Sequence, residues 1–306
     1  MARHLLSSDD VTADEQEDLL QLAAKVKSSP GDYAGALAGK AVALIFEKPS
    51  TRTRVSFEVA VASMGGHPLA LGSSELQLGR GETIEDTGRV LSRYVDAVVL
   101  RTFGQQRLEL LSSTATVPVI NALSDYEHPC QCLADLLTVR EQRGSLEGLT
   151  LTYLGDGNNV AHSLLLGGAK AGMNLRVATP PGYEPIPQVV SRATEIAGER
   201  GGSIDVSNDP VGASEGADVL YTDVWASMGQ EREAAERVLI FTPFQLDQRK
   251  VQAAADEVVV LHCLPAHRGE EITDEVIDGP RSAVWDQAEN RLHTQKALLL
   301  FLLGLA

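Results

Sequence analysis

Three hydroxyl groups and two guanidinium groups lie within five consecutive residues, Ser50-Thr51-Arg52-Thr53-Arg54. The segment follows an apolar run at 41–46, and the residues after it predict a helix over 53–65. A hydroxyl of Ser50 or Thr51 can cap that helix, whose N–H groups and dipole attract anions. Arg52 can add a bidentate, charge-assisted contact. We therefore predict a site for a phosphate-bearing substrate, against the plainer alternative of a capped helix with solvated arginines.

Other polar residues follow further apolar runs and share one position in the predicted elements. Arg101 ends the run at 96–101, and Asp223 follows the run at 218–222. The carboxyl ends of parallel strands meet at one edge of a sheet, where open α/β sheets bind ligands. Taken alone, these two residues could belong to an ordinary strand end and a surface loop. Together we expect one polar mouth formed by Ser50–Arg54, Gln77, Arg101, His128, Asn158, Asn159, Asp223, His262 and Cys263.

The elements that must position these residues alternate between short β-rich runs and helical stretches. The predicted strands cover 41–46, 67–71, 96–101, 117–121, 150–154, 173–178, 203–206, 218–222 and 257–262. The predicted helices include 11–27, 53–65, 82–94, 104–113, 129–143 and a last one near 286–305. This alternation indicates an α/β protein of two domains, each a parallel sheet flanked by helices, with the active site in the interdomain cleft.

The length of 306 residues suits two domains of about 150 residues each. The stretch at 144–148 is the predicted hinge between them. We expect the first domain to cover 1–143, with the C-terminal helix 286–306 packing back on it. The second domain is expected to cover 144–285.

Composition excludes several classes of protein. A net charge of −16 argues against a nucleic-acid-binding surface, which would be basic. The longest apolar run, 297–306, is too short to span a membrane. The acidic N-terminal segment resembles neither a secretory signal nor a transit peptide. Three cysteines suggest a reducing compartment without disulfides, so we expect a cytoplasmic protein with no membrane partner.

His128 precedes Pro129, which suits the first turn of the helix predicted over 129–143. His128 should then lie at the cap and point into the polar mouth. A metal site is an alternative, but the cysteines lack the usual C-x₂₋₄-C spacing and no second paired motif exists. We therefore expect no metal, although the chain offers His128, Cys130, Cys132, His262, Cys263 and His267. Cys130 and Cys132 are expected to pack in the core.

Three further segments bear on a second ligand. Gly155-Asp156-Gly157-Asn158-Asn159 suggests a dinucleotide site, but the G-x-G-x-x-G fingerprint is incomplete because residue 160 is valine. Asp223-Val224-Trp225-Ala226-Ser227-Met228-Gly229 places a carboxylate before a loop that could grip an amine. Cys263, within His262–Gly269, is either an inert core thiol or an acid–base partner. Arg291 either reaches the phosphate-bearing substrate that we predict at Ser50–Arg54 or lies on the surface.

Five segments together resemble the carbamoyltransferases, and within them the ornithine carbamoyltransferases. They are FEKPSTRTR, HPCQ, DVWASMG, HCLPAHRG and ENRLHTQKA, and they follow one another along nearly the whole chain. The STRTR and HPCQ segments mark the wider family, whereas HCLP and D-x-x-x-S-M-G point to ornithine. The resemblance implies that carbamoyl phosphate and L-ornithine give L-citrulline and phosphate without metal or cofactor. It also implies a homotrimer or an assembly of trimers, acting in arginine metabolism.

The resemblance also assigns substrates to domains and residues. It implies that the 1–143 domain binds carbamoyl phosphate and that the 144–285 domain binds L-ornithine. The positions that match carbamoyl phosphate contacts are Ser50, Thr51, Arg52, Thr53, Gln77, Arg101, His128, Gln131, Cys263, Leu264 and Arg291. Those that match ornithine contacts are Asn159, Asp223, Ser227 and Met228, and those with implied catalytic roles are Cys263, Arg101 and His128.

Several alternatives stay open at this point. The residue matching Cys263 is commonly a proton acceptor, but direct proton transfer to the phosphate is equally sound chemistry. The family often has G-D-x-x-N-N, so the shorter turn here leaves Asn158 as an alternative to Asn159. A carbamoyltransferase for another amine such as putrescine, a non-catalytic binding protein and a Rossmann-type oxidoreductase are the competing functions. Aspartate carbamoyltransferase fits the HCLP segment poorly.

Overall fold

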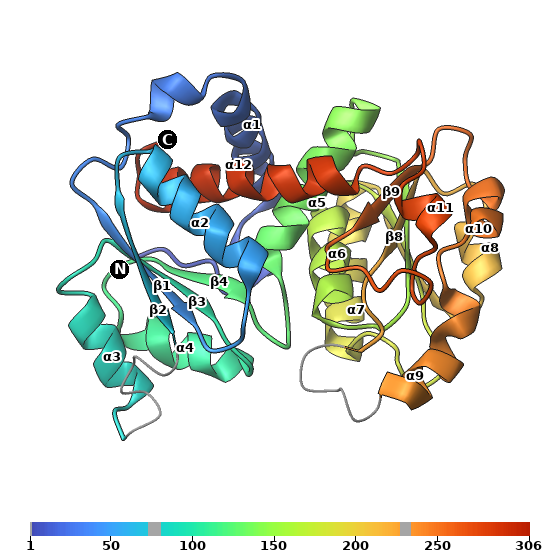
Figure 1. Ribbon diagram of the computed structural model, residues 1–306, viewed down its shortest axis with the longest axis horizontal. Helices are drawn as coiled ribbons and strands as arrows, with labels where there is room; N and C mark the ends of the chain where they lie inside the picture. The colour runs from blue at the N-terminus through green and yellow to red at the C-terminus, as the bar shows by residue number, and fades with distance from the viewer. Residues whose placement is uncertain (1, 73–80, 227–233) are drawn as a thin grey trace. The chain divides into compact units, whose positions relative to one another are not determined.

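The computed structural model describes residues 2–72, 81–226 and 234–306, which form two compact units (Figure 1). Unit 1 comprises Met1–Leu137 and Glu289–Ala306, and unit 2 comprises Thr138–Ala288. Each unit is a parallel sheet flanked by helices, which confirms the predicted α/β class. Among the described residues, no helix has both the length and the apolar character needed to cross a bilayer.

Unit 1 contains a four-stranded sheet in the order β2-β1-β3-β4. Its strands are β1 Ala41–Phe46, β2 His67–Gly72, β3 Ala97–Arg101 and β4 Val119–Leu123. Its helices are α1 Ala13–Ser28, α2 Thr51–Ser63, α3 Ile84–Leu91, α4 Gln105–Thr114, the first part of α5 Pro129–Arg143 and most of α12 Val284–Leu302. Figure 1 shows α2 on one face of the sheet and α3 and α4 on the other.

Unit 2 contains a five-stranded sheet in the order β7-β6-β5-β8-β9. Its strands are β5 Thr150–Leu154, β6 Asn174–Ala178, β7 Ser203–Ser207, β8 Val219–Thr222 and β9 Val259–His262. Its helices are α6 Asn159–Lys170, α7 Pro187–Arg200, α8 Pro210–Ser214, α9 Ala234–Phe241, α10 Gln248–Ala253 and α11 Asp274–Ile277. Helices α6 and α7 cover one face of the sheet, and α8, α10 and α11 lie over the other (Figure 1).

Strands β1, β3, β8 and β9 are largely apolar runs because helices cover both sheet faces. Five of the six residues of β1 and all of β3, β8 and β9 are buried. Polar side chains enter only where these strands end. Arg101 is the last residue of β3, Asp223 follows β8, and Cys263 follows β9.

Two boundaries differ from the sequence prediction for identifiable reasons. The strand predicted over 117–121 begins at Val119, because Pro118 has no N–H to donate to a ladder. Pro118 contributes only its carbonyl, which accepts from the Val98 N–H at 2.8 Å. The helix predicted over 82–94 begins at Ile84, because the Thr83 hydroxyl caps it by accepting from the Asp86 N–H.

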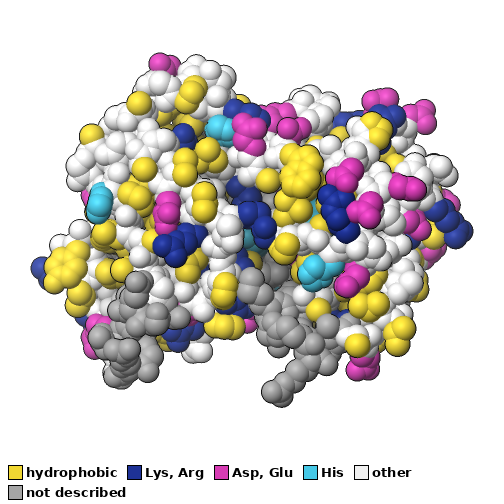
Figure 2. Space-filling model, in the orientation of Figure 1, with side chains coloured by type: hydrophobic (Ala, Val, Ile, Leu, Met, Phe, Trp, Pro, Cys, Tyr) yellow, Lys and Arg dark blue, Asp and Glu magenta, His cyan; other side chains and the backbone are white. Residues whose placement is uncertain are grey.

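On the face shown in Figure 2, Asp and Glu side chains are scattered rather than gathered into one patch.

Candidate active site

The start of α2 in unit 1 has the geometry of an anion site. The helix begins at Thr51, and Ser50 occupies the cap position with an extended backbone. The Ser50 side chain makes no capping hydrogen bond, so the predicted hydroxyl cap is wrong. No hydroxyl at the cap position competes for the N–H groups of the first turn, which therefore suit an anion.

Three arginines of unit 1 come from distant parts of the chain. Arg52 lies in the first turn of α2, Arg101 ends β3, and Arg291 belongs to α12. Arg101 is only 9% exposed and Arg291 only 3%. The Arg291 guanidinium donates to the hydroxyl of Thr53, which is buried in the first turn of α2. Arg291 therefore lies beside the helix start, which resolves the alternative that it is a surface residue.

His128 lies close enough to these arginines for their positive charge to affect its pKa. It precedes α5, and its carbonyl accepts from the N–H groups of Gln131 at 3.0 Å and Cys132 at 3.2 Å. The imidazole is buried, and this burial holds the pKa of His128 well below its usual value. The positive charges of Arg291, Arg101 and Arg52 lower this pKa further. His128 is therefore a neutral imidazole at pH 7, placed among guanidinium groups.

Two supporting contacts hold the segment that carries His128. The Nε2 of Gln131 donates to the Asp135 Oδ1 at 2.8 Å. The fully buried Glu127 carboxylate accepts from the Ser7 hydroxyl at 2.5 Å and from the Ser8 N–H at 2.8 Å. Sequence analysis missed Glu127. An acid directly before a candidate site histidine was the available signal.

Asp223 is the centre of a second polar cluster, in unit 2. Its Oδ1 accepts from the Val224 N–H at 2.8 Å and from the Cys263 thiol at 2.9 Å. Its Oδ2 accepts from the Asn158 Nδ2 at 3.0 Å. Asp223 itself is only 6% exposed. Residues at the ends of β8 and β9 are thus brought into direct contact, as strand-end positions predict.

The two adjacent asparagines have different tasks. The Asn158 Oδ1 caps α6 by accepting from the N–H groups of Val160 at 2.9 Å and Ala161 at 3.3 Å. The hydroxyl of Tyr153 also donates to this oxygen, at 3.3 Å. Asn158 is therefore committed to the fold at both ends of its amide. Asn159 is the first residue of α6 and is only partly buried.

His262 and Glu271 hold the backbone next to Cys263. The His262 Nδ1 accepts from the Leu264 N–H at 2.8 Å, so the Nε2 carries the ring proton and faces the Glu271 Oε1 at 2.9 Å. Both side chains are fully buried. Leu264 has a φ of 59°, a left-handed conformation that leucine rarely adopts. The His262–Glu271 pair therefore positions an unusual turn, and Glu271 was missed from sequence.

A buried ion pair, Arg237–Asp156, braces the same cluster. The Arg237 guanidinium donates to Asp156 and to the Trp225 carbonyl, and it stacks over the Tyr183 ring with 4.8 Å to the ring centre. Burial raises the pKa of Asp156 to about 6, which Arg237 opposes and Asp223 reinforces. The pair links the turn before α6 to the segment after β8.

The glycine-rich turn after β5 is filled by the protein itself. A Cβ on Gly157 would lie 2.3 Å from the Pro185 backbone nitrogen. Gly157 is therefore needed for close packing against the segment before α7. This packing supplies a structural reason for the glycine and disfavours the dinucleotide interpretation.

The cysteines and histidines differ in what they offer a metal. Burial raises the pKa of the Cys130 thiol to about 12, which suits core packing. Asp223, His262 and Cys263 have potential ligand atoms within 4.8 Å of one another. However, both ring nitrogens of His262 are already engaged, so this group does not form a complete ligand set.

Three predicted site residues, Gln77, Ser227 and Met228, lie outside the described residues. The remaining predicted residues fall into the two clusters described above or directly beside them. Residues of the first cluster come from α2, β3, α5 and α12, and residues of the second come from the ends of β5, β8 and β9.

Comparison with known families matches both halves of the chain. A profile described as "Aspartate/ornithine carbamoyltransferase, carbamoyl-P binding domain" matches residues 3–141. A second, described as "Aspartate/ornithine carbamoyltransferase, Asp/Orn binding domain", matches residues 147–302. The chain belongs to the aspartate/ornithine carbamoyltransferase family. Within this family match, Arg291 falls in the range of the second profile although α12 places it in unit 1.

Individual carbamoyltransferases are similar over the full length. The chain is 62% identical to the ornithine carbamoyltransferase of Parafrankia sp. (strain EAN1pec), over 99% of this chain and 96% of the relative. It is 58% identical to that of Acidothermus cellulolyticus, over 100% and 98%. The solved ornithine carbamoyltransferase of Pyrococcus furiosus superposes with a TM-score of 0.96 at 55% identity, covering 99% of this chain and 97% of that one.

Proposed function

We propose that this protein transfers the carbamoyl group of carbamoyl phosphate to the δ-amine of L-ornithine, giving L-citrulline and phosphate. The observation that carries this proposal is the charge contrast between the two clusters. Unit 1 gathers three arginines around a neutral His128, whereas unit 2 presents Asp223 with Cys263. The first suits a phosphate and a carbonyl, and the second suits an amino acid with an ammonium group.

The proposed carbamoyl phosphate site is the unit 1 cluster, within a domain that we place at 1–143 with the C-terminal helix. Arg52 and Arg291 would hold the phosphate, with the N–H groups of the α2 start adding donors. Arg101, His128 and Thr53 would stabilise the oxyanion that develops on the carbamoyl oxygen, at about 3–4 kcal/mol for a well-placed donor. A neutral His128 can donate one N–H without adding a further charge. The complete proposed set also includes two residues of unit 2, Cys263 and Leu264. Its members are Ser50, Thr51, Arg52, Thr53, Gln77, Arg101, His128, Gln131, Cys263, Leu264 and Arg291.

The proposed ornithine site is the unit 2 cluster, within a domain that we place at 144–285. The Asp223 carboxylate would accept from the α-ammonium of ornithine. Asn159 is the proposed ornithine contact by its match to the family, whereas the side chain of Asn158 caps α6 and donates to Asp223. Ser227 and Met228 complete the proposed set from the sequence alone.

The reaction forms a bond between the ornithine δ-nitrogen and the carbamoyl carbon, and it breaks the bond from that carbon to the phosphate oxygen. The attacking amine must be neutral and must lose one proton. Two acceptors fit: Cys263 as a thiolate, once its own proton has passed to the Asp223 carboxylate 2.9 Å away, and the departing phosphate. Orientation of two bound substrates would supply a large further part of the acceleration. The location of the reaction in an interdomain cleft stays a prediction.

We further propose a homotrimer, or an assembly of trimers, that acts in arginine biosynthesis in the cytoplasm. Two features support parts of this proposal. Helix α2 exposes the apolar side chains of Val55 and Val59, at 51% and 44%, which favours a subunit contact there. The three cysteines are all free thiols, as a reducing compartment requires. Light scattering should give a mass of three chains of 32.7 kDa, or a multiple of that mass.

The function is tested by assaying carbamoyl transfer to L-ornithine, putrescine and N-acetylornithine side by side. We expect rapid citrulline formation and little product from the other two amines. A preference for putrescine would overturn the choice of substrate. Tight carbamoyl phosphate binding without any turnover would instead indicate a non-catalytic binding protein.

A further inference from the structure

We propose that His267, Glu270 and Glu271 of unit 2 bind a divalent transition-metal ion such as Zn²⁺, at a site separate from Cys263. The three residues lie on the turn that follows β9 and the HCLP segment. They are not among the residues that the proposed carbamoyl transfer requires for substrate contact. The inference therefore goes beyond that function and can fail without affecting it.

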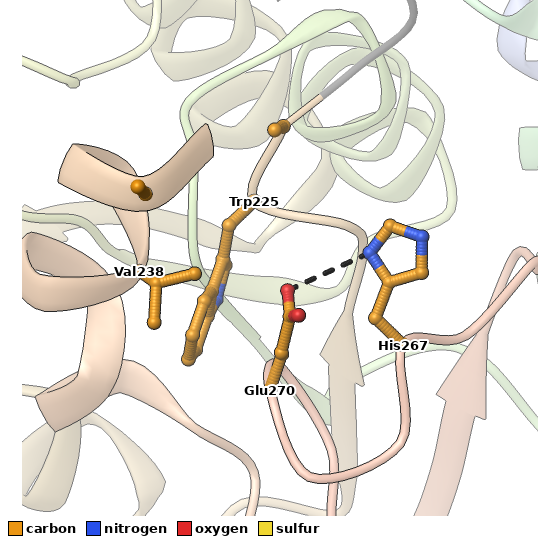
Figure 3. Close-up of a pocket in the computed structure, with 6 residues that line it drawn as sticks. Trp225, Val238, His267 and Glu270 are labelled. Atoms are coloured by element: carbon orange, nitrogen blue, oxygen red, sulfur yellow. Dashed lines mark ion pairs between the residues drawn. The ribbon is translucent and has the colours of Figure 1, made fainter. Parts of the chain in front are cut away.

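The ligand atoms are already close together. One ring nitrogen of His267 and one carboxylate oxygen of each glutamate lie within 4.8 Å of one another. The His267 Nδ1 and the Glu270 Oε2 are 3.6 Å apart, and Figure 3 shows the two side chains turned toward each other. The turn is held by a hydrogen bond from the Glu270 N–H to the His267 carbonyl at 2.9 Å. Little rearrangement is therefore needed to bring the three groups onto one ion.

Glu271 supplies an independent observation. Its side chain is fully buried, and its Oε1 accepts from the His262 Nε2 at 2.9 Å and from the His267 N–H at 2.6 Å. Its Oε2 is buried and has no hydrogen-bond partner among the described residues. A buried carboxylate oxygen without a partner is costly, and in native proteins it calls for an ion or a water. A cation bound there would satisfy it.

The nearest basic side chain in the sequence does not fill this role. Arg268 donates to Asp274 at 2.7 Å and to Asp278 at 2.5 and 2.9 Å. These two carboxylates commit its guanidinium to α11 and to the residue after it. Arg268 therefore does not compete with a cation for Glu270 and Glu271.

The surroundings allow access and room for water ligands. The side chains of His267 and Glu270 are 49% and 46% exposed, so an ion can enter from solvent. Both residues also line a pocket of about 270 Å³, whose other walls include Trp225 and Val238 (Figure 3). This volume holds several waters beside the ion.

The donor set selects the class of metal. One imidazole and two carboxylates, with open positions for water, suit Zn²⁺ and Co²⁺. Mg²⁺ and Ca²⁺ prefer oxygen ligands alone. No sulfur belongs to the set, which separates this site from Cys263.

The experiment titrates the full chain with Co²⁺, followed by visible absorption, and with Zn²⁺, followed by calorimetry. We expect one ion per chain, d–d bands of nitrogen and oxygen coordination, and no sulfur-to-cobalt charge-transfer band. His267→Asn and Glu270→Gln should each weaken binding at least about tenfold. Zn²⁺ should also raise the unfolding temperature of the wild type and not of these variants.

Two variants serve as controls. Glu275→Gln neutralises an exposed acid on α11 and should leave binding unchanged, as should Cys263→Ser. Absence of saturable binding would overturn the proposal. So would binding that survives His267→Asn and Glu270→Gln, or binding that disappears with Cys263→Ser. Because binding is read without turnover, these outcomes leave the carbamoyl transfer proposal untouched.

Discussion

The two polar clusters are built on the same principle and carry opposite charge. Each collects most of its side chains from strand ends and helix starts of one parallel sheet. The unit 1 cluster combines guanidinium groups with an imidazole whose pKa is lowered first by burial and then by their charge. The unit 2 cluster centres on Asp223, which accepts from the Cys263 thiol, an amide and a backbone N–H.

This difference shows how one architecture can separate two substrates. Neighbouring cations repel one another, so the unit 1 cluster gains most from an anion that neutralises them. The donors that Asp223 has among the described residues are a thiol, an amide and a backbone N–H, so a ligand ammonium can add a stronger, charge-assisted contact. Four changes would break or sharpen this contrast.

The largest effect is expected from Arg52→Ala. Removing one charge-assisted contact to a phosphate should raise the KM for carbamoyl phosphate or lower kcat/KM by about a hundredfold to a thousandfold. Arg54→Ala is the matched control, because Arg54 lies in the same helix turn and pairs with Glu58 at 2.8 Å. Steady-state kinetics with each substrate varied would measure both. Normal carbamoyl phosphate affinity in Arg52→Ala would refute the anion site.

Asp223→Asn should lower kcat/KM for ornithine, the other substrate. The neutral amide loses the ion pair with the ornithine ammonium, at a cost of roughly tenfold to a hundredfold in kcat/KM for ornithine. The dissociation constant of carbamoyl phosphate, measured by calorimetry, should stay near the wild-type value. Equal losses in the use of ornithine and in the binding of carbamoyl phosphate would mean that the two units do not bind one substrate each.

His262→Gln tests the turn beside Cys263. Loss of the Leu264 N–H acceptor and of the Glu271 partner leaves buried groups unpaired, at a cost of about 1–3 kcal/mol. We expect kcat/KM for ornithine to fall by about tenfold or more, with a smaller loss of carbamoyl phosphate binding because Cys263 and Leu264 belong to that proposed set. An unchanged kcat/KM for ornithine would show that His262 only fills space in the core.

The smallest expected effect concerns His128, whose imidazole should not titrate in the range that is usual for histidine. Because the pKa of His128 is well below its usual value, its NMR signals should stay constant between about pH 8 and pH 6. His128→Asn would assign the signals. The unfolded chain takes up this proton near pH 6.5 while the native chain does not, so His128 makes stability fall as pH drops below about 6.5. Titration of His128 near pH 6.5 would contradict the prediction that its pKa is lowered and its imidazole neutral.

Much of this arrangement could be predicted from sequence, because strand ends are marked by local patterns. Apolar runs that stop at Arg101, before Asp223 and before Cys263 reveal which residues line the sheet edges. Long-range partners carry no such mark. Glu271 holds His262 from nine residues away, and Arg237 reaches Asp156 across 81 residues. These contacts depend on packing that no local spacing encodes.

A local signal can also mislead. Ser50 has the residue type and position of a helix cap, yet its hydroxyl makes no capping bond. Asn158 and Asn159 are identical in type, and only the hydrogen bonds of Asn158 separate a cap from a candidate ligand contact. Side-chain orientation, rather than residue type, decides both cases.

The central claim is that the arginine cluster binds carbamoyl phosphate and that the Asp223 cluster binds ornithine. A crystal structure with a bisubstrate analogue that joins a phosphonate to ornithine tests it most directly. We predict the phosphonate at the start of α2, against Arg52 and Arg291, and the α-ammonium on Asp223. A phosphonate bound away from these arginines, or an ammonium that does not contact Asp223, would contradict the account.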